Sequence, residues 1–198
     1  FNRKYHRTGK PSVDDPQWCN WRRQQITDTV RAVYQKVHSL KPGLKVSAST
    51  IAWGSCPRDF TQTAAYRLVF QDWRLWMREG ILDANMPMNY KDPSVAKDNE
   101  SFGDWVAGAK RWSYGRHVYS GLMLFNDFTG AARQIELARK KGAEGVVGFS
   151  FSQSDCKDAL AVNLKKTVFS GTATIPSMPW VNTKAQGHEQ ATGLGEVR

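Results

Sequence analysis

Residues 81–90 read ILDANMPMNY, and this stretch decides the fold that the sequence predicts. Residues 81–88 are a short, mostly apolar run, which is typical of a buried strand. Gly80 comes directly before the run and ends a helical pattern, as glycine commonly does. The run ends on an amide and a phenol, Asn89 and Tyr90, so we expect the strand to present these two side chains at an edge of a sheet.

The same alternation of strand and helix recurs along the chain. Three further strand patterns occupy residues 44–53, 117–124 and 145–151. Apolar residues recur at helical spacing in the segments 16–40, 66–79, 102–112, 129–141 and 155–168. No hairpin signal joins consecutive strands. Strands linked by helices pair in parallel, so the sequence predicts an α/β protein.

The number of strands suggests part of a larger architecture. No P-loop and no GxGxxG follows any predicted strand, which argues against a nucleotide-binding doubly wound sheet and predicts no cofactor. A (β/α)₈ TIM barrel needs eight units and about 250 residues, whereas this chain has 198 residues. We therefore expect residues 1–170 to form about four βα units, the second half of such a barrel, with the first half missing. Residues 171–198 lose periodicity and are expected to form a linker or tail.

The net charge of +10 is concentrated near the amino terminus, where residues 1–45 hold ten Lys and Arg against three acidic residues. One interpretation is a polyanionic partner, such as nucleic acid or an anionic cell-wall polymer. The other is a solvated helix face with a basic arm. We favour the second and expect no nucleic-acid partner, because no basic block resembles a nucleic-acid-binding motif. The sequence has no run of about 18 apolar residues, so we expect no transmembrane segment.

Several kinds of chemistry have no support in the sequence. Cys19, Cys56 and Cys156 are far apart, without CxxC spacing, and no HExxH occurs, so we expect no metal site and free or buried thiols. There is no GxSxG and no cysteine with a histidine nearby. Acyl-transfer chemistry is therefore not indicated.

Four segments together resemble the bacterial glycosyl-hydrolase-like family 10. They are WCNWRRQQITDTVRAVYQKV (18–37), LKVSASTIAWG (44–54), QDWRLWMREGILDANMPMNY (71–90) and GVVGFSFS (145–152). The resemblance extends from Phe1 to about His188. It implies a TIM barrel, an extracytoplasmic location (secreted, periplasmic or cell-surface) and hydrolysis of a glycan, with peptidoglycan strands lacking stem peptides as one substrate class. It also implies a carboxylate motif upstream of Phe1, so we expect this fragment alone to be inactive.

The resemblance directs attention to the carboxyl ends of the strands, where such barrels hold their active sites. Amides can bridge sugar hydroxyls, and phenol or indole rings offer an apolar face to a pyranose. The predicted substrate-binding residues are Trp53, Asn89, Tyr90, Lys91 and Asn126. The alternatives are that Asn89 caps its strand, Tyr90 packs in the loop, and Trp53 lies in the core.

Asp127 is the best candidate for a catalytic carboxylate, acting as acid, base or electrostatic stabiliser. Its alternative is a turn and helix start, since Asn-Asp is common there. We interpret Asp155 as a helix cap and Asp83, early in its strand, as structural. Glycoside hydrolysis needs two carboxylates roughly 5–10 Å apart, and only one is named here. The rival function is therefore a non-catalytic carbohydrate- or cell-wall-binding module.

Overall fold

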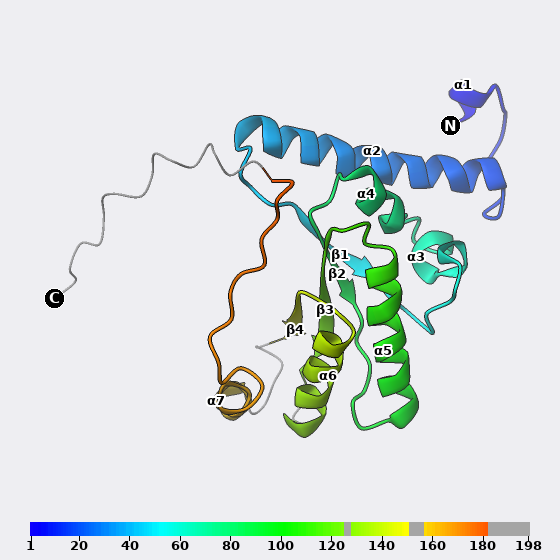
Figure 1. Cartoon of the computed structure of the whole chain (residues 1–198). Helices are drawn as coiled ribbons and strands as arrows, with labels where there is room; N and C mark the ends of the chain where they lie inside the picture. Colours follow the sequence, from blue (N-terminus) through cyan, green and yellow to red (C-terminus); the bar gives the residue numbers. More distant parts are fainter. Residues whose placement is uncertain (125–127, 151–156, 182–198) are drawn as a thin grey trace.

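A parallel four-stranded sheet with the order β1-β2-β3-β4 lies at the centre of the chain (Figure 1). It is seen in a computed structural model that describes residues 1–124, 128–150 and 157–181. The strands are β1 Ser47–Ile51, β2 Ala84–Met88, β3 His117–Met123 and β4 Gly145–Phe149. Each strand lies inside its predicted range. The predicted α/β class and parallel pairing are confirmed.

The helices begin and end largely where their capping residues predict. They are α1 Asn2–Tyr5, α2 Pro16–Leu40, α3 Ala64–Arg67, α4 Trp73–Glu79, α5 Ala96–Arg111, α6 Phe128–Lys140 and α7 Lys157–Lys166, with a 3₁₀ turn η1 at Phe60–Gln62. The carboxylate of Asp15 accepts a hydrogen bond from the Trp18 backbone N–H at 2.9 Å, and Pro16 occupies the first turn of α2. Gly80 ends α4 in the left-handed region, at φ 70°. The short helix α1 was not predicted.

The predicted single helix over 66–79 is wrong, because the chain breaks it into α3 and α4 at Phe70. Phe70 adopts φ 59°, and the Gln71 backbone N–H turns back to donate to the Ala65 carbonyl at 2.7 Å. The break brings two side chains to the end of β1. Gln71 Oε1 accepts from the Ile51 backbone N–H at 2.9 Å, and Trp73 Nε1 donates to the Ile51 carbonyl at 3.3 Å. Both polar backbone groups of Ile51 are thereby satisfied.

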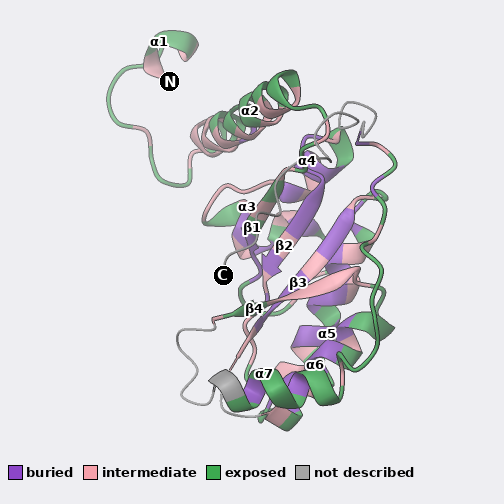
Figure 2. Ribbon diagram, turned by 90° about the vertical axis from the view of Figure 1, so that its left-hand side faces the viewer, coloured by how far each residue is buried: buried purple, intermediate pink, exposed green. Residues whose placement is uncertain are grey.

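Two apolar cores fill the space between the sheet and its helices, and they appear purple in Figure 2. The first centres on Phe60, whose ring meets the rings of Trp73 and Trp112 edge-on at 4.6 and 5.1 Å. The second lies under α5, α6 and α7. It consists of Phe102, Val106, Leu122, Ala131, Ile135, Ala138, Leu160 and Leu164. Burial of these faces fixes the helices on one side of the sheet.

At the amino-terminal end of the strands, the fully buried carboxylate of Asp83 bonds to several of the surrounding elements. It accepts four hydrogen bonds. The donors are the Tyr34 hydroxyl (3.2 Å), the Val46 backbone N–H (2.8 Å), the Arg116 guanidinium (3.0 Å) and Trp180 Nε1 (2.8 Å). A carboxylate with this set of partners fits the structural role predicted for Asp83.

Trp180 belongs to a segment that returns to the sheet after α7. Met178 and Val181 are buried against Ala84, and Trp180 and Tyr119 pack beside them. Part of the segment predicted as a tail therefore contacts the strands, while the boundary at residue 170 stays a prediction. Within the described ranges, no helix has both the length and the apolar composition needed to span a bilayer.

Candidate functional site

The carboxyl end of β1 carries an exposed indole and a carbonyl that joins three parts of the chain. Trp53 lies two residues after the end of β1, and 53% of its surface is exposed. The neighbouring Gly54 carbonyl accepts hydrogen bonds from Trp105 Nε1 of α5 at 2.8 Å and from Lys91 Nζ at 3.0 Å. The loops after β1 and β2 are therefore tied to each other and to α5.

An aromatic pair spans the same edge of the sheet, one ring from the end of β2 and one from the end of β4. The rings of Tyr90 and Phe149 are stacked, with centroids 5.3 Å apart and planes 23° apart. Phe149 is 47% exposed. We call these two rings the aromatic platform. Partial burial raises the pKa of the Tyr90 phenol, so the hydroxyl stays protonated and can donate a hydrogen bond at neutral pH.

The platform depends on a glycine in the strand between its two rings. A Cβ added to Gly121 of β3 would lie 2.6 Å from the Pro87 carbonyl oxygen and 3.3 Å from Cε1 of Tyr90. Only a residue without a side chain leaves space for Tyr90 to lie across β3. The sequence therefore sets the position of the Tyr90 ring through Gly121.

Lys91 is held at both ends. Its backbone carbonyl accepts a hydrogen bond from Gln134 Nε2 of α6 at 3.1 Å, and its ammonium donates to Gly54. Burial lowers the pKa of the Lys91 ammonium, and the nearby Asp98 carboxylate acts in the opposite direction. An ammonium has three donors, and the bond to Gly54 uses one of them. The position suits contact with hydroxyl or carboxylate groups of a ligand.

Asn89 lies apart from these side chains, on the helix-facing side of β2. It is fully buried, and its Nδ2 donates to the Phe102 carbonyl of α5 at 3.0 Å. Its Oδ1 is buried and has no hydrogen-bond partner among the described residues. The structure thus brings Trp53, Tyr90 and Lys91 to one edge and places Asn89 behind them. A substrate-binding role for Asn89 stays a prediction.

The predicted catalytic residue Asp127 and the predicted ligand Asn126 lie outside the described residues, as does Asp155. The carboxylates in the described loop after β2 are engaged locally. Asp92 Oδ1 accepts from both the backbone N–H and the hydroxyl of Ser94, at 2.8 and 2.7 Å, and these bonds lower the pKa of Asp92. The Asp98 carboxylate accepts from the Asp92 backbone N–H at 3.1 Å. The lowered pKa of Asp92 is the opposite of the raised pKa that proton donation requires.

Sequence reasoning did not single out Phe149, although it forms half of the platform. The run GVVGFSF (145–151) is predicted only as a strand, and the sequence analysis assigns no role to the ring of Phe149. Alternation could have found it, because side chains point to opposite faces in turn. The pairing of Met123 with Phe149 puts Phe149 on the same face as Gly121 and Tyr119 of β3.

A comparison with known proteins identifies a family that this chain matches. The family described as glycosyl hydrolase-like 10 matches residues 1–127. The chain is 26% identical to glycosyl hydrolase YngK of Bacillus subtilis (strain 168) over 217 residues, which cover 98% of this chain and 41% of that protein. The chain thus spans about two-fifths of the length of this curated relative. No solved structure matches. The family resemblance found in the sequence is confirmed.

Proposed function

The chain belongs to the glycosyl hydrolase-like 10 family, and from this premise we propose that it is part of a glycoside hydrolase that cleaves O-glycosyl bonds in a glycan. The observation that carries the proposal is the aromatic platform with Trp53 and Lys91 at the carboxyl edge of the sheet. Aromatic faces and a few polar groups are the usual means of holding a sugar ring.

The proposed architecture is a (β/α)₈ barrel to which this chain contributes four βα units. Strands that are parallel and adjacent in chain order are the arrangement found in such barrels. The face of the sheet that bears Met86, Met88 and the aromatic platform would then point into the barrel. The carboxyl edge would form one side of the substrate groove, as active sites in this fold do.

The residues receive separate roles in the proposal. The aromatic platform and Trp53 bind the apolar faces of sugar rings, while Lys91 and Asn126 bind hydroxyl or acidic substituents. Asn89 supports the loop that carries Tyr90. Asp127 acts as acid, base or electrostatic stabiliser, with a second carboxylate required across the scissile bond. No cofactor is proposed.

The proposed substrate is a bacterial cell-wall glycan, with peptidoglycan strands lacking stem peptides as the first polymer to test. The location proposed with it is extracytoplasmic, where such a polymer is found. The relative from Bacillus subtilis is named a glycosyl hydrolase. The substrate and location proposed here go beyond that name and rest on the family resemblance.

A second candidate function is a non-catalytic carbohydrate-binding module. The observation that favours it is that Asp92 is bonded to Ser94 and Asp98 to the Asp92 backbone N–H, next to rings able to bind sugars. Binding needs the rings and Lys91 and no acid. The two functions therefore differ in the need for Asp127.

The full product of the gene distinguishes the two functions when it is incubated with purified glycan strands. Reducing ends released per minute and protein retained on the polymer are measured for wild type and for Asp127→Asn. Release by wild type that falls at least a hundredfold in Asp127→Asn, with retention unchanged, supports the hydrolase and its catalytic residue. Retention without release supports the binding module. If the protein is not retained on the polymer and releases no reducing ends, both functions are contradicted.

A further inference from the structure

A second surface, separate from the candidate site, combines aromatic rings with arginines. It is formed by the amino-terminal half of α2 and by the turn between α3 and α4, which lie next to each other in Figure 1. We call it the arginine–aromatic surface. Its members are Trp18, Trp21, Arg22, Arg23, Tyr66 and Phe70.

The guanidinium groups of this surface lie over aromatic rings. The Arg22 guanidinium carbon lies 3.8 Å from the ring centroid of Phe70 and 5.0 Å from that of Trp18. The Arg23 guanidinium carbon lies 4.0 Å from the ring centroid of Tyr66. Contact with these rings restricts the guanidinium groups, which reduces the entropy lost when a ligand binds them.

The backbone at Phe70 is unusual. Its φ of 59° is a conformation that bulky residues rarely adopt. This is the residue that breaks the predicted helix, and the break turns its ring towards Arg22. Unfavourable backbone conformations persist where the surrounding structure requires them, and such positions are common at ligand-binding sites.

The charge of Arg22 and Arg23 is not neutralised by an ion pair in the described parts of the chain. Arg22 donates to the Val13 carbonyl at 2.8 Å and to the Cys19 sulfur at 3.3 Å, both uncharged acceptors. Arg23 donates to the Tyr66 carbonyl at 3.2 Å and to the Asn20 side chain. The acidic group near Arg23 is Asp72, whose carboxylate caps α4 through the Leu75 backbone N–H at 3.1 Å.

Further exposed cations lie close in sequence to the arginine–aromatic surface. The exposed ones nearest in sequence are Arg3, Lys4, Arg7, Lys10 and Arg67, of which Arg7 is paired with Asp15 at 2.6 Å. The region is therefore strongly positive, and it is the location of most of the +10 net charge. Uncompensated guanidinium groups in a fixed orientation match planar, negatively charged groups, with carboxylates and phosphates as the common partners.

We propose that the arginine–aromatic surface binds a polysaccharide that carries carboxylate groups. The carboxylates would bond to the guanidinium edges of Arg22 and Arg23, a contact that needs no free ring face. A nucleic acid is the less suitable partner, because the two indoles are already stacked on each other at 5.1 Å and the rings of Tyr66 and Phe70 are covered by guanidinium groups. Bases need exposed ring faces on which to stack.

The surface lies close to the candidate site, because α3 follows the carboxyl end of β1 and contacts that strand. A long glycan held at the aromatic platform could therefore extend to it. The binding does not depend on hydrolysis, so the two proposals can fail separately.

The test measures binding of the full chain to polygalacturonate, with fully methyl-esterified polygalacturonate as the uncharged counterpart and an oligothymidylate as the nucleic-acid probe. We expect the acid form to bind at least tenfold more tightly than the ester, and binding to weaken steeply between 50 and 300 mM salt, since these are roughly the concentrations at which screening becomes effective. This comparison uses wild-type protein only, so it does not require any variant to fold.

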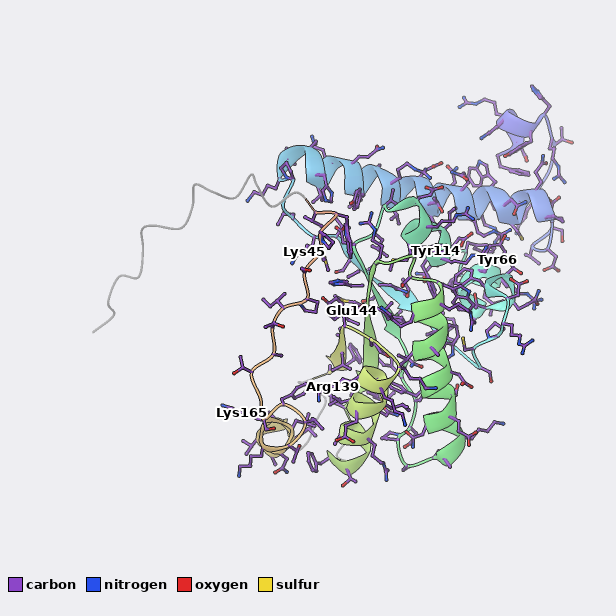
Figure 3. All side chains as sticks on the ribbon, viewed as in Figure 1. Lys45, Tyr66, Tyr114, Arg139, Glu144 and Lys165 are labelled. Atoms are coloured by element: carbon purple, nitrogen blue, oxygen red, sulfur yellow. The ribbon has the colours of Figure 1, made fainter. Side chains whose placement is uncertain are left out.

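A matched pair of variants then assigns the binding to the surface. Arg22→Met/Arg23→Met removes two charges while keeping most of the side-chain stems, and Lys165→Met/Lys166→Met removes two from α7. Figure 3 shows Lys165 on the far side of the molecule from Tyr66. We expect the arginine variant to lose at least tenfold in affinity for the acid polymer and the lysine variant less than twofold. Equal binding to acid and ester, equal losses in the two variants, or tighter binding to the oligothymidylate would each overturn the proposal.

Discussion

The ring of Tyr90 stacks on the ring of Phe149, with centroids 5.3 Å apart, although the two residues end strands that are separated by β3. The contact crosses β3 above Gly121, where a side chain would meet both the Pro87 carbonyl and the Tyr90 ring. The aromatic platform is therefore a product of sheet order and of one glycine. Its geometry leads directly to a stability test.

Gly121→Ala should lower the free energy of unfolding by about 2 kcal/mol, because overpacking a close contact typically costs this much. The added Cβ would lie 2.6 Å from a backbone oxygen, which cannot move as a flexible side chain could. Gly171→Ala is the control, since no atom lies within 4 Å of a Cβ at that position. Urea denaturation of both variants measures the difference. Equal midpoints for the two variants would show that Tyr90 and β2 shift at no cost.

Asp83→Asn should destabilise the chain by about 3 kcal/mol, because it leaves the Arg116 guanidinium without its buried counter-charge. Asp28→Asn is the matched control, since Asp28 is half exposed and its pair with Arg31 lies at the surface. Exposed pairs contribute about 1 kcal/mol or less. Thermal and urea unfolding compare the two. A loss at Asp83 no larger than the loss at Asp28 would contradict the structural role of the buried carboxylate.

Trp180→Phe should release residues 178–181 from the sheet, while the rest of the chain stays folded. The substitution keeps an aromatic ring beside His117 but removes the N–H that donates to Asp83 at 2.8 Å, a loss of about 1.5–3 kcal/mol for a bond to a charged acceptor. Amide hydrogen exchange should become at least fivefold faster at Val181, whose N–H donates to the Met178 carbonyl. Ile175→Val, at a position 84% exposed, should leave that rate unchanged. An unchanged rate in Trp180→Phe would show that Met178 and Val181 hold the segment alone.

Cys56 should react slowly with alkylating agents at neutral pH. Burial raises the pKa of its thiol to about 11, so roughly one molecule in a thousand carries the reactive thiolate at pH 8. In a Cys19→Ser/Cys156→Ser variant, the iodoacetamide rate should rise about tenfold per pH unit from pH 8 to 10. A plateau near pH 9 would contradict the burial effect. Because the folded-state pKa is the higher one, the stability that the buried thiol contributes is present below pH 9 and is lost as the pH rises towards 11.

Much of the fold could be predicted because it depends on local signals. The cap at Asp15 and the stop at Gly80 mark helix ends, and the short β-branched runs mark strands. The break at Phe70 could not be predicted in this way. The spacing of Tyr66, Val69 and Trp73 continues a helical stripe, and the bonds of Gln71 and Trp73 to Ile51 depend on tertiary structure.

The candidate site was predictable in part, for the same reason. The sequence alone predicts that Tyr90 and Lys91 lie just after the end of a strand. The bond from Lys91 to Gly54 joins residues 37 positions apart, and the contact of Tyr90 with Phe149 depends on a glycine in another strand. Asn89 differs from Tyr90 by one position, and alternation along the strand therefore turns its side chain to the helix side.

The most direct test of the central claim, that the carboxyl edge of the sheet binds a glycan, is the affinity of Tyr90→Ala for purified glycan strands. Tyr114→Ala is the control, because Tyr114 is an exposed tyrosine that precedes β3, away from the carboxyl edge, and Figure 3 labels it. The affinities are measured by calorimetry on the full gene product, with Tyr90→Phe included to separate ring from hydroxyl. We expect at least a tenfold loss for Tyr90→Ala, a smaller loss for Tyr90→Phe and none for Tyr114→Ala. An affinity of Tyr90→Ala within twofold of wild type would contradict the assignment of this edge as the sugar-binding site.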